Sequence, residues 1–231
     1  MRAFCGLELG RDAIPDETTI LNFRHLLERH ALTKAVFAAV ASHLEARGEM
    51  LRGGTIVDAT LIAASPSTKN EAGRHDPAMT SSKKGNQWYF GMKAHIGVDA
   101  QSGLVHMAGV TTGKVHDAKV MHRLIREDDV AVYGDKGYAK DARKRAAQEA
   151  GVTWAVKEKA KPGRALTQRQ RARNRRFGKV RAKVEHVFRV VKCQFGYRRA
   201  RYRGIAKNGA QVFVLLALAN LYLVRGRLAP A

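Results

Sequence analysis

Cysteines, acidic residues and long apolar runs are all scarce in this sequence. Its 231 residues include two cysteines, Cys5 and Cys193, which are too few and too far apart for a disulfide framework or a cysteine-based zinc site. The most apolar stretch, Val212 to Val224, is interrupted by Asn220 and is shorter than the about 20 residues that a bilayer span needs. The amino terminus lacks the pattern of a signal peptide. We therefore expect a cytoplasmic protein with a core helix near its carboxyl end and no membrane partner.

Acidic residues are outnumbered two to one by basic residues. The chain has 42 Lys and Arg against 20 Asp and Glu, which gives a formal net charge of +22 and a pI near 10.6. In a compact chain the excess positive charges repel one another unless a polyanion lies against them. Nucleic acid is therefore the expected partner. An enzyme that acts only on neutral small molecules is disfavoured. The hydrophobic fraction of 45% is ordinary and predicts a packed core.

The order of apolar patterns predicts an α/β fold. Helical spacing after Pro15 and again from Thr33 predicts a helical hairpin, a partial helical domain over residues 1–50 that is too small to be stable alone. Residues 51–231 follow the order β-β-β-α-β-α-β and end in two helices, which predicts a mixed sheet flanked by helices. We expect strands over residues 55–64, 93–98, 104–112, 131–135 and 152–158, helices over residues 117–125, 140–150, 174–194 and 206–223, and loops over residues 69–85 and 159–173.

Three carboxylates are candidates for catalysis. Asp58 lies inside a predicted apolar strand and Asp135 ends another, and a charge in such a place is costly unless it is paired or binds a cation. Glu185 falls at the edge of the apolar stripe of the helix predicted over residues 174–194, so it can point towards the strands. The three acids can therefore converge. Taken singly, each is better explained by a structural role in a turn, a cap or a solvated helix face.

Converging carboxylates without companion cysteines suit hard divalent cations. Mg²⁺ and Mn²⁺ prefer oxygen ligands, and two such ions can clamp the attacking and leaving oxygens of a phosphodiester displacement. His95, His106 and His116 lie on separate predicted elements without i,i+4 pairing, so we do not expect a histidine metal cluster. The predicted cofactor is Mg²⁺ or Mn²⁺.

The helix that carries Glu185 also carries cations on the same face. Arg181 lies four residues before Glu185 and Lys192 seven after, rotations of about 40° and 20° at 3.6 residues per turn. The alternative is an ordinary i,i+4 ion pair on a wet surface. Residues 164–207 contain 16 Lys and Arg but one acid, whereas a solvated surface normally mixes both signs. The predicted DNA contacts from this segment and from the residue after Asp135 include Arg175, Arg176, Lys179, Arg181, Lys192 and Lys136.

Aromatic residues and lysines alternate in the segment KKGNQWYFGMKAH. An aromatic side chain flanked by cations can stack on an unpaired base, which makes Trp88, Tyr89 and Lys93 candidates for DNA contact. Packing on the two faces of a strand is the simpler explanation of the same pattern.

Five motifs resemble those of the DDE transposases of bacterial insertion sequences, specifically the insertion sequence 5 family. They are TIVDATLIAA, KKGNQWYFGMKAHIGVD, VHDAK, YGDKGY and RAKVEHVFRVVK, and the similarity runs from about Gly6 to Leu223. The resemblance implies a ribonuclease H-like αβ sandwich in a bacterial cytoplasmic protein. It also implies that Asp58, Asp135 and Glu185 bind two Mg²⁺ for DNA strand cleavage and strand transfer.

The resemblance has two departures. The family's helix signature, Tyr-x2-Arg-x3-Glu-x6-Lys, matches at Arg181, Glu185 and Lys192, but Gly178 stands in place of the tyrosine. Members also carry several tens of residues ahead of the segment GLELGRDAIPDETTILNFRHLL, so we expect an N-terminally truncated helical domain. The resemblance further implies that the protein acts as a homo-oligomer on paired transposon ends.

Two other functions remain open from the sequence alone. The first is a catalytically disabled, transposase-derived DNA-binding protein, which would bind DNA without nicking it in Mg²⁺. The second is a ribonuclease H-like structure-specific nuclease, which would cut branched DNA without joining ends.

Overall fold

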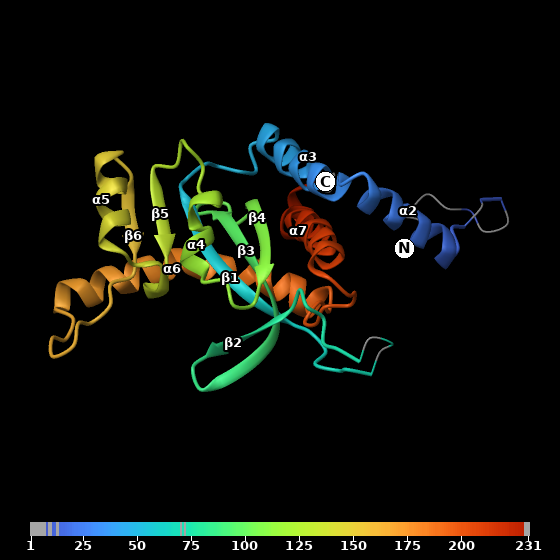
Figure 1. The fold of residues 1–231 in the computed structure, drawn as a ribbon. Coiled ribbons are helices and arrows are strands. Elements are labelled where there is room, and N and C mark those ends of the chain that lie inside the picture. Colours follow the sequence, from blue (N-terminus) through green and yellow to red (C-terminus); the bar gives the residue numbers. More distant parts are fainter. Residues whose placement is uncertain (1–7, 9–10, 13, 70, 72, 229–231) are drawn as a thin grey trace.

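The structure, a computed structural model, describes residues 8, 11–12, 14–69, 71 and 73–228. Cys5 lies outside the described residues, and Cys193 is a free, exposed thiol. The described residues form a six-stranded mixed sheet with helices against it (Figure 1), which confirms the α/β class. The strands are β1 (Thr55–Ala63), β2 (Thr80–Lys84), β3 (Gln87–Asp99), β4 (Val105–Thr112), β5 (Ala131–Gly134) and β6 (Thr153–Val156). The α-helices are α2 (Glu17–Arg29), α3 (Leu32–Ala46), α4 (Asp117–Val120), α5 (Asp141–Glu149), α6 (Gln168–Arg189) and α7 (Ile205–Leu228), with 3₁₀ turns η1 (Met121–Arg123) and η2 (Lys136–Tyr138).

The centre of the sheet is β1, the strand that contains Asp58. It pairs antiparallel with β3 along its whole length, but it pairs parallel with β5 only at Thr55 and Ile56. The sheet order is β2-β3-β1-β5-β6, with β4 paired to β3. Both faces of β1 are buried, which explains why Ile56 and the adjacent Val57 are both apolar and fully buried.

Two apolar clusters fill the two faces of the sheet. The larger cluster joins Ile56 and its neighbours to α6, through side chains such as Val184, and to α7, through side chains such as Leu216. The smaller cluster joins Val57 to α4 and η1 on the opposite face, where Leu124 is almost fully buried. Asp58 directly follows Val57 of the smaller cluster and lies two residues after Ile56 of the larger cluster, so its carboxylate sits at the margin of the apolar core.

The two N-terminal helices relate differently to the sheet. Helix α3 packs against α7, and the rings of Phe37 and Phe213 meet edge to face with centroids 5.8 Å apart. Helix α2, capped by Asp16, buries none of its residues and extends away from the sheet (Figure 1). The division of the chain at residues 50 and 51 stays a prediction.

The predicted loop over residues 69–85 is wrong at its carboxyl end. Residues 80–84 form β2, which pairs with the first residues of β3, and β3 begins at Gln87 rather than at Lys93. The resulting hairpin projects from the body of the molecule (Figure 1). The described residues of β2 are all polar, and they alternate between half-buried and exposed, so the sequence of β2 lacks the apolar alternation by which strands are predicted.

Helix α6 begins six residues before its predicted start. The Thr167 hydroxyl accepts from the Gln170 N–H, and the Gln170 side chain accepts from the Thr167 N–H, which is a complete capping box. The predicted loop over residues 159–173 therefore ends at residue 167. The helix continues past Arg189 as a π-helical segment, Val190–Gln194, which contains Lys192.

Two predicted helices differ in length from the helices that the structure shows at the same positions. The helix predicted over residues 117–125 is only α4 followed by η1, and the one predicted over residues 206–223 extends to Leu228 as α7. In the described part of the chain, α7 alone is long and apolar enough to cross a membrane, but half of its most apolar window is buried. Its Asn220 amide donates to the Val105 carbonyl at 2.7 Å and accepts from the Val105 N–H at 2.8 Å. These contacts fit the predicted core helix.

Candidate catalytic site

Asp58 faces helix α6 from the middle of β1. Its side chain is 23% exposed, and its Oδ2 accepts a hydrogen bond from Arg181 Nη2 at 3.0 Å. The other oxygen accepts from the Ala59 N–H at 2.8 Å. Burial raises the pKa of the Asp58 carboxyl and the nearby Asp135 raises it further, while Arg181 lowers it. The negative charge of the carboxylate is therefore incompletely compensated, and a further positive charge nearby would stabilise it.

Asp135 lies near Asp58 where strands β1 and β5 separate. The pairing of β1 with β5 stops after Ile56, so the two strands are not hydrogen bonded at the level of Asp58. Asp135 follows the last residue of β5 and caps η2 by accepting from the Gly137 N–H. Acids at the carboxyl ends of parallel strands gather at one edge of a sheet, which is where such folds bind ligands.

Glu185 is exposed on α6, on the flank that faces β1. Two cations on the same flank contact β1: Arg181 reaches Asp58, and Lys192 Nζ donates to the Leu61 carbonyl at 2.9 Å. Glu185 lies between these contacts, one turn after Arg181. Among the described residues, however, no three His, Cys, Asp or Glu side chains are close enough to hold a metal ion. The structure thus brings two of the three predicted acids together, and the third stays a prediction.

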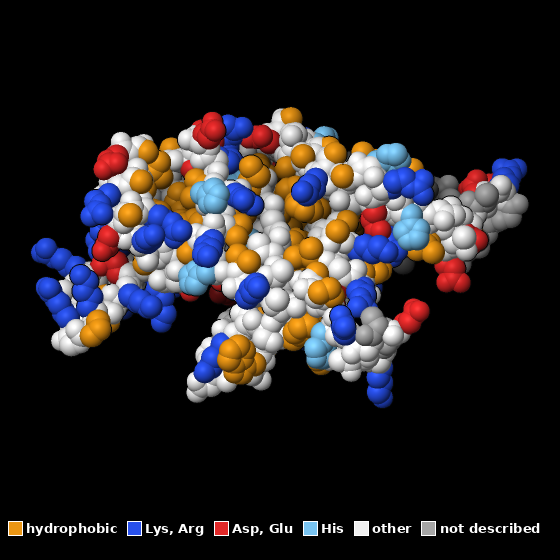
Figure 2. Space-filling view, in the orientation of Figure 1, with side chains coloured by type: hydrophobic (Ala, Val, Ile, Leu, Met, Phe, Trp, Pro, Cys, Tyr) orange, Lys and Arg blue, Asp and Glu red, His pale blue; other side chains and the backbone are white. Residues whose placement is uncertain are grey.

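The predicted DNA-contacting residues fall into two groups. Arg175, Arg176, Lys179 and Lys136 are exposed, and Lys and Arg side chains gather over the first half of α6 and the segment before it, at the left of Figure 2. Trp88 is 66% exposed in the β2–β3 hairpin, and Lys83 Nζ lies 5.9 Å from its ring centroid.

The other predicted contacts are engaged within the protein. Lys93 donates to the Val115 carbonyl at 2.9 Å and forms an ion pair with Asp117 at 2.9 Å. The Tyr89 hydroxyl donates to the Gln87 side chain at 2.6 Å. As described above, Arg181 and Lys192 bind β1. A DNA contact from any of these residues would require the side chain to leave its present partner.

The family of the chain is decided by a match over most of its length. A family model described as "Transposase DDE domain" matches residues 49–221, a range that contains all three predicted acids. The chain belongs to the DDE transposase domain family. No solved structure matches it. Membership indicates a nucleic-acid-processing enzyme with a role in transposition and DNA as its partner, in a family that typically uses divalent metals.

Tyr138, which lies near the acids of this transposase, was not assigned a role from the sequence. The Tyr138 hydroxyl is buried and has no hydrogen-bond partner among the described residues. Burial raises its pKa strongly, and the charges of Asp58, Asp117 and Asp135 raise it further, so the phenol lies within the electrostatic influence of all three carboxylates. The quoted motifs VHDAK and YGDKGY contain Asp117 and Tyr138, but a motif does not show which side chains meet.

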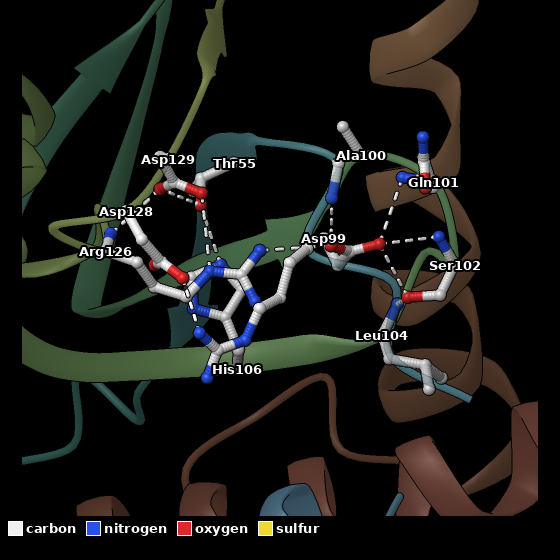
Figure 3. Close-up of polar contacts among 12 residues, drawn as sticks. Thr55, Asp99, Ala100, Gln101, Ser102, Leu104, His106, Arg126, Asp128 and Asp129 are labelled. Carbon is white, nitrogen blue, oxygen red and sulfur yellow. Dashed lines mark hydrogen bonds and ion pairs between the residues drawn. The ribbon is translucent and has the colours of Figure 1, made fainter. Parts of the chain in front are cut away.

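A second polar cluster holds the amino end of β1 in the transposase (Figure 3). Asp99 is fully buried and accepts from the guanidinium of Arg126 at 3.0 Å, and Arg126 also binds Asp129 at 3.3 Å. The Thr55 hydroxyl binds both Asp129 and, at 2.8 Å, His106 Nε2. This network fixes the start of β1 three residues before Asp58. Sequence reasoning missed it because its members are far apart in the chain.

Acid should destabilise the transposase through its buried histidines. Burial lowers the pKa of His106 to about 3 and that of His95 to about 4, below the ordinary value of 6.5. At a pH between the lowered pKa values and 6.5, these histidines are protonated in the unfolded chain but neutral in the folded chain. The free energy of unfolding therefore falls as the pH drops below 6.5. Urea unfolding near neutral pH and near pH 5 should show a shallower pH dependence for His106→Gln than for the wild type. The matched control is His122→Gln, at an exposed position, and an equal dependence for all three proteins would contradict the prediction.

Proposed function

We propose that the protein is an insertion-sequence transposase, of the insertion sequence 5 type, that cleaves DNA at transposon ends and joins them to target DNA. The observation that carries this proposal is the pair Asp58 and Asp135 at the open edge between β1 and β5, facing the helix that contains Glu185. Antiparallel β1, β3 and β4 followed by parallel β5 and β6 support a ribonuclease H-like core. Working as a homo-oligomer on paired ends belongs to the same proposal.

The donor set fits hard divalent cations. Asp58 and Asp135 offer only oxygen ligands, and the raised pKa of Asp58 reflects negative charge that burial and Asp135 make unfavourable. Asp58, Asp135 and Glu185 would hold the ions. Bound Mg²⁺ or Mn²⁺ would supply neutralisation of the charge that develops on the phosphodiester oxygens.

In this proposal Arg181 has two partners in turn. It forms an ion pair with Asp58 in the structure, and its Nε is buried without a hydrogen-bond partner among the described residues. When cations and DNA are bound, Arg181 turns from Asp58 to a phosphate, for which its planar fork is suited. The exposed Glu185 side chain turns towards Asp58 in the same step, since it lies on the same flank of α6.

Trp88 should stack on an unpaired base. Replacing it with alanine should weaken binding to DNA with unpaired bases by about 5- to 150-fold, since one stacked base contributes about 1–3 kcal/mol. Its 66% exposure means that folding should be unaffected. Fluorescence anisotropy with single-stranded and fully paired oligonucleotides measures both affinities. The control is Met107→Ala, an exposed apolar position on β4, and an equal loss on both DNAs would contradict stacking.

The proposed function is tested by adding Mg²⁺ or Mn²⁺ to the protein with DNA that carries the terminal repeats of its element. The transposase proposal expects nicking at the ends and strand-transfer products in a plasmid target. Binding without nicking would instead support the DNA-binding protein, and cutting of branched DNA without joining would support the structure-specific nuclease.

A further inference from the structure

A cleft lined by cations opens beside Asp135, on the side of β6. Its volume is about 730 Å³, and it lies between the start of α5 and the segment that joins β6 to α6. The Lys157 N–H donates to the Gly134 carbonyl at 3.1 Å, which fixes one wall of the cleft next to Asp135. The lining cations are Lys140, Lys144, Lys157, Lys159, Lys161 and Arg164.

The positive charge of this cleft is poorly compensated by the protein. Its lining contains two acids, Asp141 and Glu158, against six cations. Glu158 is engaged by Arg173 and by the Gln170 side chain, which donates to it at 2.6 Å, so its charge is already neutralised. In the described ranges, none of the six lining cations forms an ion pair. Such a surface is stabilised by a polyanion.

The outer rim of the cleft is an ordered turn with a cation at each end. The Arg164 N–H donates to the Lys161 carbonyl at 3.0 Å, and Gly163 between them has a φ of +70°, which favours glycine. The cleft is therefore a preformed feature. Its cations are spread over both walls and the rim, which suits a phosphate chain that passes through.

The chemistry of the lining suits contacts with a DNA backbone rather than with bases. No aromatic side chain lines the cleft, so it offers no platform for stacking. Five of its six cations are lysines, which act as flexible point charges and contact phosphates without reading sequence.

The position of the cleft separates it from the hairpin that carries Trp88. In the sheet order β2-β3-β1-β5-β6, the hairpin lies on the β3 side of Asp58 and the cleft lies on the β6 side. Asp58 and Asp135 therefore stand between a surface with aromatic residues and a surface without aromatic residues that is rich in phosphate-binding cations. The reaction proposed above brings together two DNA segments, of which only the transposon end must be identified by its sequence.

We infer that the cleft binds the sugar-phosphate backbone of the target DNA. This inference rests on the proposed function, because it assigns the second substrate of the same site. It predicts that loss of the cleft cations lowers strand transfer more than end cleavage, since cleavage needs only the transposon end.

The test uses the full chain with Lys140→Gln, Lys144→Gln and Lys161→Gln combined. With a random-sequence duplex, the slope of log K against log salt should become shallower by about 2.7, at about 0.9 for each phosphate that the variant no longer neutralises. Transfer of a pre-cleaved transposon end into plasmid DNA should fall by about tenfold or more, while end cleavage stays within about twofold. The matched control removes three exposed cations around α4 and η1: Lys114→Gln, Lys119→Gln and Arg123→Gln.

The outcomes separate this inference from the proposed function. An unchanged salt slope in the cleft variant, or an equal change in the control, would overturn the cleft as a DNA site. Equal reductions of cleavage and transfer would assign the cleft to the transposon end and overturn the target assignment. If the wild type shows no Mg²⁺-dependent chemistry at all, the proposed function fails, and the target assignment fails with it, whereas the salt slope still reports whether DNA enters the cleft.

Discussion

Asp135→Asn should abolish Mg²⁺-dependent strand cleavage while DNA binding persists. The loss should be on the order of a thousandfold or more, since the substitution removes a negative charge from the proposed ion-binding site. Asparagine keeps a side-chain oxygen that can accept from the Gly137 N–H, so η2 should keep its cap and the fold should be preserved. A nicking assay with an end-labelled substrate, together with binding measured at several salt concentrations, gives both results.

The control for this experiment is Glu149→Gln. Glu149 is an exposed carboxylate at the last residue of α5, and its conversion to an amide changes the net charge by the same amount. Cleavage should be unchanged in this variant. Retained cleavage in Asp135→Asn, at a rate within about tenfold of the wild type, would remove Asp135 from the catalytic site.

Arg126→Ala should lower the free energy of unfolding more than a substitution at an exposed position does. Arg126 is the cation between Asp99 and Asp129, which are both buried, and its removal leaves two carboxylates without their charged partner. Removing one member of a buried charge cluster costs about 3–5 kcal/mol. For a chain of this length each kcal/mol lowers Tm by about 2–4 °C, so Tm should fall by roughly 6–20 °C.

Thermal and urea unfolding followed by circular dichroism measure this effect. The matched control is Arg123→Ala, which removes an exposed arginine three residues earlier and should change the free energy of unfolding by less than about 0.5 kcal/mol. A change below about 1 kcal/mol for Arg126→Ala would show that the remaining donors to Asp99 suffice without the guanidinium.

Most of the secondary structure could be predicted from the sequence, because hydrophobic patterning marks elements that are buried. β1 and α7 have apolar sequences and are found close to their predicted ranges. β2 could not be predicted, since its side chains are polar and it is held by pairing with β3. The early start of α6 had a visible signal in Thr167 and Gln170, which form the capping box, but the many arginines that follow suggested a loop.

The candidate site was predictable only in part. Asp58 and Asp135 were expected to converge because one lies inside a predicted strand and the other at the end of another, and in the structure the two strands are parallel neighbours. The ion pair between Asp58 and Arg181 spans 123 residues of sequence and depends on how α6 crosses β1. The crossing also decides whether Glu185 reaches Asp58, and periodicity gives the face of a helix without giving its partner.

The most direct test of the three-carboxylate site is a count of bound ions. Mn²⁺ binding can be followed by electron paramagnetic resonance on the full chain bound to transposon-end DNA, for the wild type and for Glu185→Gln. The proposal predicts a spin-coupled pair of Mn²⁺ ions in the wild type and loss of the coupled pair in the variant. Equal binding and equal coupling in both proteins would contradict it, since Glu185 would then hold neither ion.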